Sequence, residues 1–357
     1  MKHLKLFNDT VSYEAYKNGS DYVLPNVSYI EETKGVSYDP YVDLTANYLT
    51  IEALEDNLTV VLKKNKTTIY NYEYCVDGDG NWKKVTYNNP VESINTGHTL
   101  SFRGELIPEN RYSYGYGIGA FTVNKNFNLK GNCMSMLFGD NAADNYSLEG
   151  KDYAFYDLFC NCTTLKSVSA NFLPATTLAS NCYLYMFYGC TSLTIAPDLP
   201  ATALTDDCYG GMFHGCTSLT TAPELSATAL TIRCYEDMFY DCTSLTTAPT
   251  ILPATTLAAG CYQNMFNGCS SLTTAPELPA TKLAESCYYY MFENCSKLNY
   301  IKMLATDISA ILCLTYWING VASTGTFVKN SAMANLPTAT ESNDYAGIPR
   351  GWTVQNA

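Results

Sequence analysis

The sequence between Cys182 and Cys295 repeats one phrase five times. Each copy reads Cys-Tyr-x-x-Met-Phe-x-x-Cys, has a leucine three residues after its second cysteine, and reaches the next copy after 26 residues, once after 27. A fixed period of about 20 to 50 residues is typical of proteins built from stacked repeats, in which each unit contacts only its neighbours. The repeat therefore constrains the fold more strongly than any single residue does.

Weaker copies flank these five. One begins at Cys133, the next has Ala154 in the first cysteine position, and the last begins at Cys313, where Trp-Ile replaces Met-Phe. Atypical outer copies are expected because each end of a stack must close off its core. The sequence predicts eight copies over 129–330, with 331–357 forming a C-terminal cap.

Apolar residues within a copy are spaced like one face of a helix. Counted from Leu178, they recur four, eight, nine and twelve residues later, the last being Cys190. This spacing predicts a short helix around Cys-Tyr-x-x-Met-Phe. Two cysteines eight residues apart on a helix lie about 12 Å apart along its axis. A disulfide within one copy is therefore not expected.

The cysteines are predicted to be buried free thiols, because cysteine also serves as a small apolar core residue. Disulfides between equivalent cysteines of neighbouring copies are the alternative. No histidine or third cysteine joins them at the spacing of zinc ligands, so neither a metal nor a cofactor is expected. Two columns are predicted for the core, the first formed by Cys182, Cys208, Cys234, Cys261 and Cys287, the second by Cys190, Cys216, Cys242, Cys269 and Cys295.

Short strands are predicted ahead of the repeats, within 47–128. Their number and spacing are typical of an antiparallel sandwich of Ig-like size. Asp77–Asn81 resembles the start of a calcium-binding loop, but Trp82 and Asn88 replace the required Gly and Glu, so a hairpin turn is the stronger interpretation. The expected strands are 49–53, 58–62, 69–74, 82–85, 100–102 and 120–123.

Residues 1–46 are polar and rich in Tyr and Asn, which predicts a segment for attachment to a larger assembly or a flexible arm. The opening apolar run ends at Asn8 and Asp9, so it has no secretory signal pattern. No stretch approaches the roughly 18 apolar residues of a membrane span. A formal net charge of −13 without a Lys/Arg cluster argues against binding to nucleic acid.

The phrase x-x-Met-Phe-x-x-Cys-x-x-Leu, found over about 133–330, resembles the BspA-like leucine-rich repeats of Treponema and Bacteroides surface antigens. The resemblance implies a short strand in each copy, here from Leu193, and a short helix on the other face. Pro197 and its equivalents follow this strand, so the strands should be very short. The expected fold is mainly β with short helices: a leucine-rich-repeat solenoid preceded by an antiparallel Ig-like β-sandwich.

The flanking phrases are similar to a branch of these proteins found in gut Bacteroidetes and their phages. Residues 1–8 and 26–31 resemble the N-termini of phage structural proteins from the same hosts. The resemblance implies a virion fibre or decoration protein that is bound to other virion proteins through its N-terminal segment. It also allows a homo-oligomer, although no heptad pattern requires one. A bacterial cell-surface adhesin is the alternative. The phrases that carry the likeness are 48–56, 129–140, 325–330 and 348–354.

Positions that differ between copies mark the candidate ligand surface, because the core positions are fixed by packing. Tyrosines among them suit a stacking platform for a host-surface or mucosal glycan or protein, while the alternative is a solvated face. The acidic positions after the strand favour a solvated face. The candidates are Tyr185, Tyr188, His214, Tyr240, Tyr289 and Tyr290, with Asp198, Glu224 and Glu277 beside the strand.

No catalytic constellation is evident in the sequence. The histidines His3, His98 and His214 fall in different segments, and no Gly-rich phosphate loop follows a strand. Glu236 and Asp237 are adjacent, which favours a solvated pair over the separated carboxylates of a glycosidase. We therefore expect a non-enzymatic binding protein, with catalysis at a carbohydrate site of the sandwich as a distant alternative.

Overall fold

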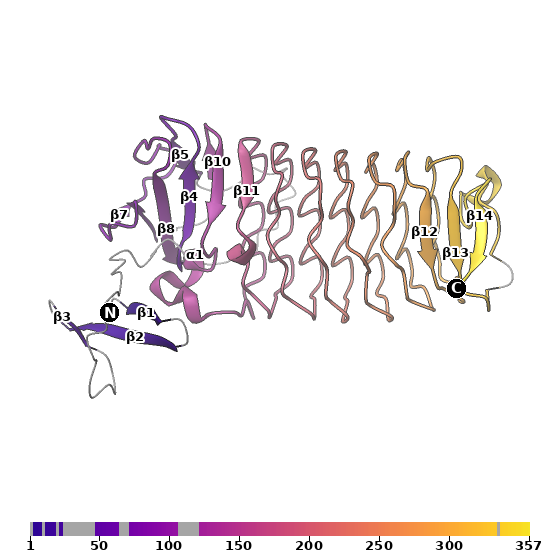
Figure 1. The fold of residues 1–357 in the computed structure, drawn as a ribbon, viewed down its shortest axis with the longest axis horizontal. Coiled ribbons are helices and arrows are strands. Elements are labelled where there is room, and N and C mark those ends of the chain that lie inside the picture. The colour runs from indigo at the N-terminus through magenta and orange to yellow at the C-terminus, as the bar shows by residue number, and fades with distance from the viewer. Residues whose placement is uncertain are drawn as a thin grey trace. The chain divides into compact units, whose positions relative to one another are not determined.

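The chain forms two compact units, Met1–Leu44 and Thr45–Ala357, each drawn in Figure 1. The first contains an antiparallel sheet of β1 (His3–Asn8), β2 (Val11–Asn18) and β3 (Asp21–Val23), in that order. The rest of the predicted attachment segment 1–46 lies outside the described residues. The computed structural model describes residues 3–8, 11–18, 21–23, 47–63, 71–105, 121–333 and 336–357.

All six strands predicted between residues 49 and 123 are present, and the expectation of a mainly β protein is confirmed. Four of them join a six-stranded sheet of order β11-β10-β4-β8-β6-β7, and β5 pairs with β9 separately. The hairpin predicted at Asp77–Asn81 connects β6 to β7. The strands are β4 (Leu49–Ala53), β5 (Val60–Leu62), β6 (Asn71–Val76), β7 (Lys83–Lys84), β8 (Thr99–Glu105) and β9 (Phe121–Val123).

One strand joins this region to the repeats. β10 (Phe127–Lys130) pairs antiparallel with β4 and parallel with β11 (Leu165–Val168), which belongs to the second copy. The boundary expected between residues 128 and 129 therefore falls inside a strand. Both regions lie in the same compact unit, and the sheet covers the N-terminal end of the repeat region (129–330).

The prediction of a short helix in each copy is wrong. The Cys-Tyr-x-x-Met-Phe segments of the five full copies are runs of turns, and the one α-helix of the described residues is α1 (Ser135–Phe138) in the first copy. Every fourth residue of a run has positive φ, as at Asn181 (58°), Tyr185 (56°) and Gly189 (67°). A left-handed residue interrupts an α-helix, yet a spacing of four places apolar side chains together much as a helix does.

Backbone hydrogen bonds in these turns alternate between two directions. The N–H groups of Tyr183, Tyr185, Phe187 and Gly189 donate to carbonyl groups of the next copy, at 2.7–3.0 Å. The N–H groups between them donate three residues back in their own copy, as Met186 does to the Tyr183 carbonyl at 3.2 Å. Each copy is thus bonded to its neighbour as strands in a sheet are, and Figure 1 shows the copies side by side.

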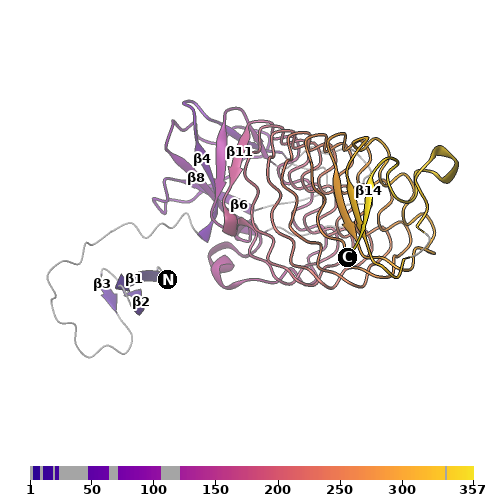
Figure 2. The ribbon, with the colours of Figure 1, turned by 45° about the vertical axis from the view of Figure 1, so that its right-hand side comes forward.

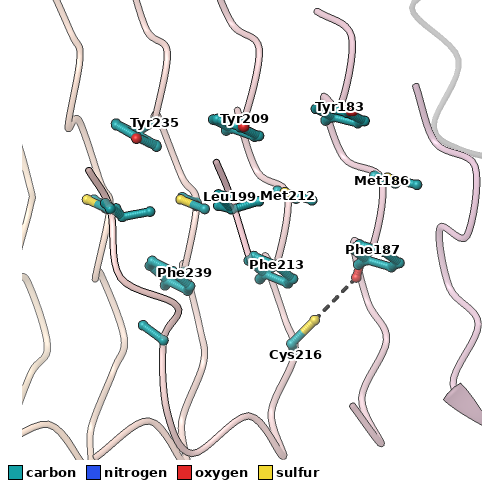
Figure 3. Packing of buried hydrophobic residues seen from close by; sticks show 14 of the residues in the cluster. Tyr183, Met186, Phe187, Leu199, Tyr209, Met212, Phe213, Cys216, Tyr235 and Phe239 are labelled. Atoms are coloured by element: carbon teal, nitrogen blue, oxygen red, sulfur yellow. Dashed lines mark hydrogen bonds between the residues drawn. The ribbon is translucent and has the colours of Figure 1, made fainter. Parts of the chain in front are cut away.

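Aromatic side chains fill the core in two parallel columns, shown in Figure 3. Ring centroids of Tyr183 and Tyr209 are 5.7 Å apart, and the rings are nearly parallel. Phe187 and Phe213 repeat this spacing at 5.7 Å. Both columns end on Trp317 of the last copy. One hydrophobic cluster runs from Leu49 in β4 through every copy to the C-terminal cap.

Strands on the other side of the copies are short, as predicted from the prolines. Between β11 and the C-terminal sheet, the described copies are linked by isolated parallel bridges such as Thr221 to Thr247. Parallel strands β12 (Tyr300–Met303), β13 (Thr326–Lys329) and β14 (Thr353–Asn356) lie at the C-terminal end of the copies in Figure 1.

The remaining helices of the described residues are short 3₁₀ turns, and no described helix is long and apolar enough to cross a membrane. They are η2 (Gly139–Asp144), η3 (Ala170–Phe172) and η4 (Glu341–Asn343).

Candidate binding surface

The turn runs place the variable side chains on one surface, which we call the turn face. It consists of the residues two, three and six positions after the first cysteine of each copy. Tyr185 and Tyr290 occupy the third position with φ of 56° and 55°. This left-handed conformation costs a non-glycine residue about 1 kcal/mol, so it persists because the bonds between copies hold it.

The central part of the turn face is a stack of Tyr188, His214 and Tyr240. The His214 ring lies 4.6 Å from the Tyr188 ring and 4.5 Å from the Tyr240 ring, centroid to centroid. Both faces of the imidazole are covered, so a ligand meets ring edges and hydroxyl groups at this point rather than an open aromatic face. Burial lowers the pKa of His214 to about 4, which keeps it neutral at pH 7.

Tyr185 and Leu184 fill a notch that two glycines of the next copy leave open. A Cβ atom at Gly211 would overlap its ring, and one at Gly210 would lie 2.7 Å from a methyl of Leu184. Burial, followed by the charges of Asp237 and Glu236, raises the pKa of Tyr185 to about 12. Tyr185 therefore packs along the surface instead of projecting from it.

Carboxylates lie beside this notch, and the expectation of a fully solvated Glu236–Asp237 pair is wrong. Both are partly buried, and burial raises the pKa of Glu236 to about 7 and also raises that of Asp237. Glu236 accepts a hydrogen bond from Gln263 at 2.6 Å and lies 3.6 Å from the Arg233 guanidinium. Arg233 itself pairs with Asp207 at 3.1 Å.

A second group of tyrosines lies at the C-terminal end of the turn face. Tyr289 meets Tyr290 edge-on at 4.2 Å, and Tyr290 stacks on Tyr316 at 5.1 Å. Tyr316 is 6.0 Å from Tyr345 of the cap. The predicted aromatic set is thus split between two clusters, and Tyr316 and Tyr345 were missed. Tyr316 occupies the same position of its copy as Tyr290, so extending the comparison to the last copy would have found it.

The predicted carboxylates beside the strand are mostly engaged with the neighbouring copy. Glu224 accepts hydrogen bonds from the backbone and the hydroxyl of Thr250, both at 3.1 Å. Glu277 pairs with Lys302 at 2.9 Å. Asp198 is exposed. Glu224 and Glu277 therefore link neighbouring copies.

All fifteen cysteines are free and buried, including both predicted columns. In the second column each thiol donates to the carbonyl of a Phe in the preceding copy, at 3.0–3.2 Å. Figure 3 draws this bond from Cys216 to Phe187. Burial raises the pKa of these thiols, so they are poor nucleophiles. Within the part of the chain that the structure describes, no group of three or more potential ligands could hold a metal ion.

Comparison of the chain with protein-family models, with curated proteins and with solved structures finds no match.

Proposed function

We propose that this chain is a non-enzymatic binding protein, a virion fibre or decoration protein that presents a leucine-rich-repeat solenoid to a host glycan or protein. The observation that carries the proposal is the contrast between core and turn face. Core positions repeat the same Cys, Tyr, Met and Phe in each full copy, while the turn face changes from Tyr185 to Gly211 to Asp237 along one column. A rigid scaffold with a varied surface is the general design of repeat proteins that bind macromolecules.

The proposed attachment to the virion rests on the resemblance of residues 1–8 and of the flanking phrases to phage proteins. The separation of Met1–Leu44 from the second unit is compatible with an attachment module. On the proposed architecture, the sheet around β4 is an Ig-like connector between that module and the solenoid. A bacterial cell-surface adhesin built from the same modules is the alternative.

Immunogold labelling with antibodies against the full chain separates the two. Label on purified phage particles, absent from uninfected cells, is the expected result. Label on intact cells together with unlabelled particles would replace the virion proposal by the adhesin. Release of reducing sugar from mucosal glycans by the purified protein would overturn the non-enzymatic part of the proposal.

A further inference from the structure

A pocket of about 480 Å³ lies where the last copy meets the C-terminal cap. Its walls come from residues 318–323 and 339–350, at the yellow end of the chain in Figure 2. The volume is within the range of small-molecule sites. Ile318 and Ala339 contribute apolar side chains, and Thr340, Ser342 and Ser323 contribute hydroxyl groups. Glu341 also lines the pocket, and its carboxylate accepts a hydrogen bond from the Tyr345 hydroxyl at 3.4 Å.

Both walls are fixed by tryptophan hydrogen bonds. The indole N–H of Trp317 donates to the Gly347 carbonyl at 3.0 Å, and that of Trp352 donates to the Ala322 carbonyl at 2.7 Å. The backbone N–H of Thr340 donates to the side chain of Asn343 at 2.7 Å, which orders the loop at the rim. A pocket held in this way requires little ordering when a ligand enters, and this favours binding.

Arg350 lines the pocket and differs from the other described arginines. Arg103 pairs with Glu73 and Asp140, and Arg233 pairs with Asp207. Arg350 has no carboxylate within 4.0 Å among the described residues, and its side chain is exposed. A guanidinium group without a partner presents a planar fork of donors that matches a carboxylate.

We propose that this pocket binds a monosaccharide unit that carries a carboxylate, such as the terminal residue of an acidic glycan. Arg350 pairs with the carboxylate. The Thr340 and Ser342 hydroxyl groups bond to each other at 2.9 Å, and Thr340 also donates to Asn343, so their remaining lone pairs accept hydrogen bonds from sugar hydroxyls. The Glu341 carboxylate accepts from a further sugar hydroxyl. The ring of Tyr345, half-buried at the pocket wall, supplies an apolar contact for the sugar ring. The inference rests on the proposed binding function and names the sugar class and the site.

A larger pocket elsewhere in the described residues does not offer this chemistry. It has a volume of about 750 Å³ and lies against β6, β8 and α1. Its guanidinium group, on Arg103, donates to Glu73 at 2.9 Å and to Asp140 at 2.6 Å, and it stacks over the Trp82 ring at 4.1 Å. Two carboxylates already neutralise this cation, so an acidic ligand gains nothing there.

The test is calorimetric titration of the full chain with N-acetylneuraminic acid and, separately, with its methyl ester. The ester keeps the shape of the sugar and removes its charge. We expect the acid to bind at least tenfold more tightly than the ester, and Arg350→Gln to weaken binding of the acid at least tenfold. Lys297→Gln, which removes an exposed cation that lies outside the pocket and has no ion pair among the described residues, is the matched control and should leave the affinity unchanged. Unfolding temperatures of both variants check that they fold.

Equal binding of acid and ester, or undiminished binding by Arg350→Gln, overturns the proposal, as does absence of binding by the wild type at millimolar sugar. A sulfated galactose that binds as tightly as the acid would replace carboxylate recognition by general anion binding and so also overturn it. If the protein binds host surfaces and Arg350→Gln binds them equally well, the proposed function stands, and the proposal that this pocket binds an acidic sugar fails. If the acid binds through Arg350 and no host surface is bound, the pocket stands and the proposed function fails.

Discussion

Cys242 provides a direct measure of what the buried thiols contribute to stability. Its side chain is fully buried in the second cysteine column, and its thiol donates to the Phe213 carbonyl at 3.1 Å. The same carbonyl accepts the backbone N–H of Cys216 at 3.0 Å. Truncation of Cys242 therefore removes one hydrogen bond without leaving a buried acceptor unpaired.

The expected cost of Cys242→Ala is the sum of three small contributions. Removing an atom about the size of a methylene group from the core costs about 0.8 kcal/mol. A residual cavity of about 20 Å³ adds about 0.5 kcal/mol at roughly 24 cal/mol per Å³. Loss of a neutral hydrogen bond adds about 0.5–1 kcal/mol. We expect a total near 2 kcal/mol. Cys242→Ser keeps a donor for the Phe213 carbonyl and should therefore cost less than Cys242→Ala.

Urea denaturation followed by circular dichroism gives both values, provided that the dependence of free energy on urea is the same in all variants. Thr243→Ala, an exposed neighbour, is the control and should change stability by less than about 0.5 kcal/mol. If Ser is more costly than Ala, the thiol acts only as an apolar filler, and the reasoning from its hydrogen bond is refuted.

Three further predictions concern the turn face and the core. Burial raises the pKa of Glu236 from its usual 4.5 to about 7, so the folded state holds this proton more tightly than the unfolded state does. The free energy of unfolding should therefore fall by about 1–2 kcal/mol between pH 5 and 8. If urea denaturation shows the same dependence of this free energy on pH for the wild type and Glu236→Gln, the prediction is refuted. Gly211→Ala adds a Cβ under the Tyr185 ring at φ +52° and should cost about 1–3 kcal/mol, part of which Tyr185→Ala recovers in the same assay; no recovery would refute the steric cause. The Tyr209 hydroxyl is buried without a partner among the described residues, so Tyr209→Phe should raise the free energy of unfolding by up to about 1 kcal/mol, and a loss of that size would contradict it.

The sequence predicts the strands well because their signals are local. Alternating apolar residues mark β4 and β8, and the glycines between Asp77 and Asn81 mark the hairpin. The helices were mispredicted because left-handed residues every four positions give nearly the same apolar spacing as a helix. Asn, Asp or Gly fills most of these positions, as at Asn181 and Asp207, and that pattern was available in the sequence.

The candidate surface was predictable only in part. Copies aligned by their cysteines place Tyr188, His214 and Tyr240 in one column, and the structure stacks them. The covering of Gly211 by Tyr185 depends on which way a side chain turns. The pocket beside Arg350 depends on how the cap meets a copy about 30 residues earlier, a distance in sequence that no periodic pattern encodes.

The alternation of backbone bonds in the turn runs has a consequence for how such a chain changes length. Each copy offers to its successor the same donors and acceptors that its predecessor offered to it. Duplication or deletion of one 26-residue copy therefore joins two surfaces that already match, as adding a unit cell extends a crystal along one axis. The distance between the two ends can grow in steps of one copy without any new packing solution, while each added copy brings a fresh set of outward side chains for selection.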